Sequence, residues 1–110
     1  MRIITLATLL LSLAFIGCQN TQPTEQELDE AITTLEKSEK VLGTYIDRLE
    51  SEFTDENLRV QILCKNYPSE YEKNYIPNML ILNSEYTKAV LLSDLDRTLE
   101  YYKQRDQIQC

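Results

Sequence analysis

Residues 24–53 read TEQELDEAITTLEKSEKVLGTYIDRLESEF, and leucine recurs there every seven residues. A second apolar residue follows each leucine by four positions, except that Glu39 takes one of these places. Apolar residues at such spacings share one face of an α-helix. Thr24 followed by Glu27 is a capping-box start. The stretch therefore predicts one long helix over residues 24–53 whose seam is formed by Leu28, Leu35, Leu42 and Leu49, with Ile32, Ile46 and Phe53 beside them.

Two kinds of packing would bury this seam: a bundle within one chain, or a parallel coiled coil with a second chain. The flanking positions hold no Lys or Arg and several acids: Asp29, Glu36, Gly43 and Glu50 on one side, and Ala31, Ser38, Tyr45 and Glu52 on the other. A parallel self-pair would set these acids opposite each other without cations. Ala31, Val41 and Tyr45 also widen the apolar stripe, which suits packing within the chain. We expect the intramolecular bundle, in which Gly43 either admits a close helix crossing or breaks the helix.

The rest of the chain is also helical in pattern, without the alternation of a strand. A second helix is expected to start at Thr54-Asp55-Glu56-Asn57 and end near Asn66, and a short helical segment, residues 69–75, to lie between Pro68 and Pro77. A further helix is expected from Pro77 to Leu91, and a last one from Ser93-Asp94-Leu95-Asp96. The prediction is an all-α fold, a small bundle of about four helices with a long first helix.

Composition bounds the chemistry of this 110-residue chain. Its 11 Lys and Arg against 18 Asp and Glu give a net charge of -7, which argues against nucleic acid and against electrostatic docking on anionic lipid. The chain has no His, and no nucleophile, phosphate-loop or metal-ligand spacing occurs in it. We therefore expect no enzymatic activity, no cofactor and no metal. Its acids read as solvated faces and helix caps, with Asp55–Arg59 and Glu36–Lys40 as minor surface pairs.

The first seventeen residues, MRIITLATLLLSLAFIG, have the pattern of a signal peptide. Arg2 forms a short basic region, and residues 3–16 are mostly apolar but too short to span a membrane comfortably, which takes about 20 residues. One alternative is ordinary secretion, with cleavage after Ala14.

The other alternative, which we favour, comes from Phe15-Ile16-Gly17-Cys18, which resembles the lipobox of bacterial lipoprotein precursors. The resemblance covers residues 1–19 only and implies that Cys18 becomes the first residue of the mature chain and carries the lipid. The residue after the cysteine is Gln19 and not Asp, which resembles lipoproteins that Gram-negative bacteria sort to the outer membrane. The expected organisation is a signal peptide at 1–17, the lipidated Cys and a polar tether at 18–23, and a helical domain at 24–110. The N-terminal lipid would anchor the protein to the membrane, and the helical domain would face the periplasm.

Cysteine parity agrees with a lipidated Cys18, because Cys64 and Cys110 then remain as a pair in an oxidising compartment. We expect these two to form a disulfide. The alternative is a reactive thiol, which would lack both a His partner and a CxxC arrangement.

Tyr67, Tyr71 and Tyr75 recur every four residues, so on a helix they would share one face. Tyrosine is enriched at binding hot spots, which makes these three candidates for partner binding. The alternative is that their rings cover the core and only the hydroxyls reach the surface.

Two functions follow from these expectations. The first is a lipid-anchored module that binds another envelope protein, as an inhibitor, an immunity or exclusion factor, or an assembly accessory. The second is a structural lipoprotein that oligomerises through its leucine seam as an envelope spacer.

Overall fold

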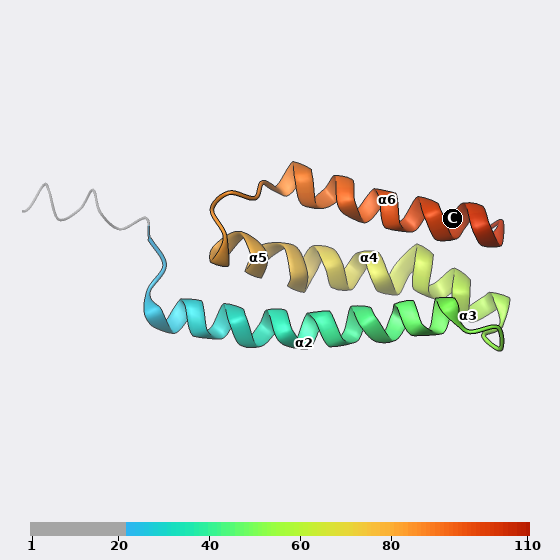
Figure 1. Cartoon of the computed structure of the whole chain (residues 1–110), viewed down its shortest axis with the longest axis horizontal. Coiled ribbons are helices and arrows are strands. Elements are labelled where there is room, and N and C mark those ends of the chain that lie inside the picture. The colour runs from blue at the N-terminus through green and yellow to red at the C-terminus, as the bar shows by residue number, and fades with distance from the viewer. Residues whose placement is uncertain (1–21) are drawn as a thin grey trace, which may run out of the picture.

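The computed structural model describes residues 22–110, which form an all-α bundle of three antiparallel helical rods (Figure 1). The first rod is α2 (Glu25–Glu50). The second is continuous and consists of α3 (Glu56–Gln61), η1 (Ile62–Asn66), α4 (Tyr67–Glu70), η2 (Tyr71–Tyr75) and α5 (Ile76–Leu82), where η marks a π-helical segment. The third is α6 (Lys88–Asp106). The predicted all-α class is confirmed. The expected signal peptide, Cys18 and most of the tether lie outside the described residues.

The long first helix begins where its cap predicts and ends earlier than expected. The Thr24 hydroxyl accepts a hydrogen bond from the backbone N–H of Glu27 at 3.2 Å, as an N-cap does. At the other end the chain becomes extended at Ser51, and Phe53, which we expected in the helix, lies in the turn with 95% of its surface exposed. Gly43 does not break the helix, and no atom lies within 4 Å of the position its Cβ would take, so it marks no close crossing either.

The leucine seam is buried within the chain only along its C-terminal half. Leu42 and Leu49 are 6% and 1% exposed, whereas Leu28 and Leu35 are half-buried. Figure 1 shows the reason: α2 begins beyond the end of α5, and α6 starts further along still, so the N-terminal half of α2 has fewer helices beside it. The expectation that all four leucines are buried is therefore wrong for the first two.

The middle rod explains why the structure has three rods instead of about four helices. Pro68 and Pro77 were expected to separate helices, yet the helical backbone continues through both prolines. A proline ring clashes with the carbonyl four residues earlier and removes a hydrogen bond. Here each proline follows a π-helical segment, in which the N–H of Tyr67 bonds to the carbonyl of Ile62 and that of Ile76 to the carbonyl of Tyr71. These wider turns move the preceding carbonyls and let the rod continue.

The N-cap of the last helix, Thr87, lies six residues before the predicted N-cap, Ser93. The chain leaves α5 at Asn83, whose side-chain oxygen accepts a hydrogen bond from the N–H of Glu85 at 3.0 Å and so forms a turn. Thr87 then caps α6 by accepting from the N–H of Val90 at 3.2 Å. At its C-terminus α6 ends in a left-handed residue, Gln107, with a φ of 55°.

The core lies between the three rods. Its buried side chains are Leu42, Leu49, Ile62, Leu63, Tyr67, Tyr71, Ile76, Leu91, Leu95, Leu99, Tyr102 and Ile108. Among residues 22–110, no helix combines the length and the apolar character that crossing a membrane would require.

Candidate functional site

The three candidate tyrosines form a row along the middle rod. The ring centroids of Tyr67 and Tyr71 are 6.1 Å apart and those of Tyr71 and Tyr75 are 4.6 Å apart, so the rings do share one face. Tyr67 and Tyr71 are only 7% and 8% exposed, and Tyr75 is half-buried. Burial is the main cause that raises the pKa of all three. The rings thus belong largely to the core, which leaves little of Tyr67 and Tyr71 for a partner.

The structure places Cys64 and Cys110 in bonding contact, with an S–S distance of 1.99 Å and Cα atoms 5.5 Å apart. The bridge ties the end of the chain to the middle rod. Ile108, two residues before the bridge, is buried in the core. The bridge and this side chain together hold the tail that follows α6.

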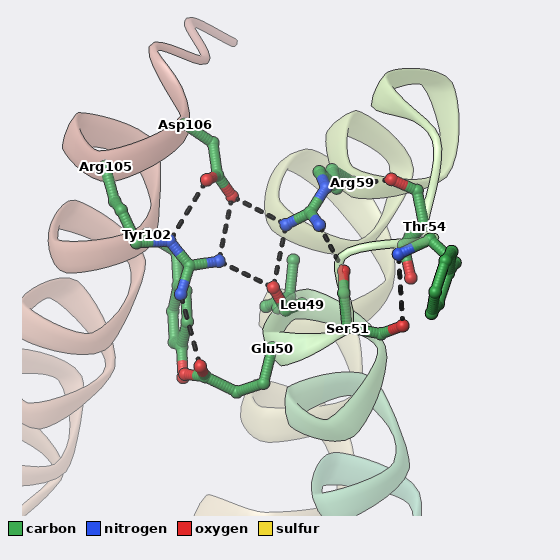
Figure 2. A network of polar contacts seen from close by, with 9 residues as sticks. Leu49, Glu50, Ser51, Thr54, Arg59, Tyr102, Arg105 and Asp106 are labelled. Carbon is green, nitrogen blue, oxygen red and sulfur yellow. Dashed lines mark hydrogen bonds and ion pairs between the residues drawn. The ribbon is translucent and has the colours of Figure 1, made fainter.

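A network of polar contacts centred on Arg59 closes the same end of the bundle (Figure 2). The Arg59 guanidinium donates to the carbonyls of Leu49 at 2.7 Å, Thr54 at 3.1 Å and Ser51 at 2.5 Å. It also forms an ion pair with Asp106 at 3.0 Å. Arg59 therefore binds the turn after α2 and the last residue of α6 at once. The predicted surface pair with Asp55 is wrong, because Asp55 instead caps α3 through the N–H of Leu58.

Arg105 extends this network to the outer side of α6. It donates to the carbonyl of Leu49 at 2.6 Å and pairs with Asp106 at 3.0 Å and Glu50 at 3.3 Å. Tyr102 donates its hydroxyl to Glu50 at 2.6 Å and carries the Arg105 guanidinium 4.9 Å from its ring centroid. Burial, followed by the hydrogen bond to Glu50, raises the pKa of Tyr102 to about 12. These groups bind one another, so the network stabilises the bundle.

Replacing Arg59 by Met should lower the free energy of unfolding by about 2–3 kcal/mol, because it removes the Arg59 donor from the carbonyls of Ser51 and Thr54 and removes the ion pair with Asp106. Arg97→Met is the matched control. Within residues 22–110, Arg97 pairs only with Asp94 on the surface, where its side chain is 77% exposed, and we expect a loss of about 0–1 kcal/mol. Urea denaturation of residues 22–110 measures both. Equal losses would show that the Arg59 contacts do not stabilise the fold.

The contacts of Asp106 should make the stability difference between the unmodified protein and Arg59→Met depend on pH. The hydrogen bond from Arg105, with the nearby charges of Arg105 and Arg59, lowers the pKa of Asp106. A lowered pKa in the folded state means that the carboxylate stabilises the fold above the ordinary Asp range and loses this effect as the pH falls through the folded value. The stability difference between the unmodified protein and Arg59→Met should therefore narrow in acid.

A polar hollow of about 200 Å³ lies between α2 and the middle rod, and sequence reasoning did not single it out. Two exposed lysines of the middle rod, Lys65 and Lys73, line it. Neither forms an ion pair with any side chain of residues 22–110. The other residues that line it are Tyr45, Asn66, Ser69, Glu70 and Asn74.

Within the described residues, no three Cys, Asp or Glu side chains gather closely enough to hold a metal ion. Comparison of the chain with protein-family models, with curated proteins and with solved structures found no match.

Proposed function

We propose that this chain is a lipid-anchored envelope lipoprotein whose acidic helical domain binds a protein partner in the periplasm. The observation that carries the proposal is Gly17-Cys18 at the end of an apolar stretch that follows Arg2. Gln19 after the cysteine supports anchoring in the outer membrane. The partner would be an envelope protein that the domain inhibits, protects or helps to assemble.

The cysteine pairing supports the anchor. Cys64 and Cys110 lie in bonding contact, so neither of them is available to pair with Cys18. In an oxidising compartment a single thiol needs another fate, and lipid attachment supplies one.

The packing of α2 favours a binding module over the envelope spacer. Leu42 and Leu49 are covered by other helices of the same chain, so this half of the seam is not available to a second copy. A spacer built as a coiled coil would need the full seam.

Replacing Cys18 by Ser should abolish labelling of the protein with radioactive palmitate and move it from the detergent phase to the aqueous phase. One acyl chain binds a membrane only marginally, whereas two or more make the anchor stable, so both changes should be close to complete. Cys110→Ser is the matched control, because it removes another cysteine and should keep both properties. Labelling that persists in Cys18→Ser would refute the anchor, and a mature N-terminus at Phe15 would instead support ordinary secretion.

A further inference from the structure

The hollow between α2 and the middle rod is a basic site on an acidic protein. Lys65 and Lys73 line it, both exposed and both without an ion-pair partner among residues 22–110. The chain as a whole has a net charge of -7. Two unpaired ammonium groups at one hollow therefore stand out against a surface that is mostly acidic.

The α2 side of the hollow carries further cations. Tyr45 of α2 lines the hollow, and Arg48 is three residues after it, on the same side of the helix. Val41, four residues before Tyr45, leaves 37% of its surface exposed, and Lys37 is four residues before Val41. Lys37, Val41 and Arg48 therefore lie on the same face of α2 as Tyr45, which lines the hollow, and Lys65 and Lys73 of the middle rod line it from the other side. We call this surface, formed by Lys37, Val41, Tyr45, Arg48, Lys65, Ser69 and Lys73, the basic groove.

The single acid in the hollow already has partners. The Asn74 amide donates to both carboxylate oxygens of Glu70, each at 3.1 Å. These bonds hold Glu70 against the middle rod, and neither lysine forms an ion pair with it, so the hollow keeps two cations against one carboxylate. Ser69 and Asn66 add uncharged groups that can donate hydrogen bonds.

We propose that the basic groove docks an acidic segment of the protein partner, an inference that rests on the proposed function. Carboxylates of the partner would pair with Lys65 and Lys73, while an apolar side chain of the same segment would contact Val41 and Tyr45. Elsewhere the acidic surface repels such a segment, so the charge pattern both attracts it to the groove and fixes its register. A larger hollow beside the C-terminal tail has no such bias, because its charged side chains are one glutamate and one lysine.

A photo-crosslinking amino acid in place of Ser69 tests the groove in cells that produce the full chain. The same amino acid in place of Tyr101, which is 59% exposed on α6, is the matched control position. We expect a protein adduct at position 69 whose crosslinked peptide, identified by mass spectrometry, is net acidic. An adduct at position 101 alone would overturn the groove and leave a protein-binding function standing. Adducts at neither position would contradict the protein-binding function and the groove with it.

Charge reversal supplies the second test. Lys65→Glu combined with Lys73→Glu should lower the adduct yield at position 69 by roughly tenfold or more, because it turns attraction into repulsion. Lys40→Glu combined with Lys88→Glu changes the net charge equally at two exposed lysines outside the groove and should leave the yield unchanged. Thermal melting followed by circular dichroism checks that both variants fold. Equal losses in the two variants, or a crosslinked peptide without an excess of acids, would overturn the proposal.

Discussion

Replacing Cys64 and Cys110 together by Ser is expected to lower the free energy of unfolding by about 4 kcal/mol. On the chain-entropy model a crosslink stabilises by restricting the unfolded chain, and a separation of 46 residues gives an effect of this size. Small domains unfold at a total cost of about 5–15 kcal/mol, so the bridge would supply a large share. Urea denaturation of residues 22–110, with and without the substitutions, measures the difference.

Reductant provides the control for this prediction. Reduction should bring the unmodified protein to the stability of the double serine variant, which should itself not respond to reductant. The exported protein should also gain the mass of two hydrogen atoms on reduction. Free thiols in that protein before reduction would refute the bridge, and equal stabilities with and without it would refute its contribution.

Local sequence signals predicted the start of each of the first two rods. Thr24 caps its helix as expected, and the second rod starts within the predicted stretch 54–57, with Asp55 as its cap, because a cap depends on residues within one turn of it. The prediction of helix breaks at Pro68 and Pro77 failed because a proline ordinarily ends a helix, and nothing in the local sequence indicates that a π-helical segment will accommodate it. The start of α6 at Thr87 competed with a second acceptable cap at Ser93, and the turn formed by Asn83 favours the first.

The end of the bundle could not be predicted from the sequence, because its contacts join residues far apart in it. Arg59 has a plausible partner four residues away in Asp55, yet it pairs with Asp106, 47 residues later. Its other partners are backbone carbonyls, which no residue type identifies. The basic groove could not be predicted either, because it joins residues of different helices. Lys65 and Lys73 are eight residues apart, and they line one hollow with Tyr45 of another helix only once the rods have packed.

The second large effect is expected at the buried end of the leucine seam. Leu49 is 1% exposed and packs between the rods, so Leu49→Ala should lower the free energy of unfolding by about 2–5 kcal/mol, the usual range for truncating a core leucine. Leu28 occupies the equivalent position three heptads earlier but is half-buried, and Leu28→Ala should cost about 1 kcal/mol. Urea denaturation of residues 22–110 and of the two variants gives both values.

This pair of leucines separates the bundle from a coiled coil between chains. In a parallel zipper both leucines would be seam residues covered by the partner helix, so the two substitutions would cost similar amounts. The stability of a zipper would also rise with protein concentration by mass action, whereas that of a bundle would not. Melting residues 22–110 at two concentrations differing about a hundredfold tests the second point. An unchanged midpoint with unequal losses at Leu49 and Leu28 fits α2 packed within its own chain, and a rising midpoint with equal losses would show that the helix pairs with a second copy.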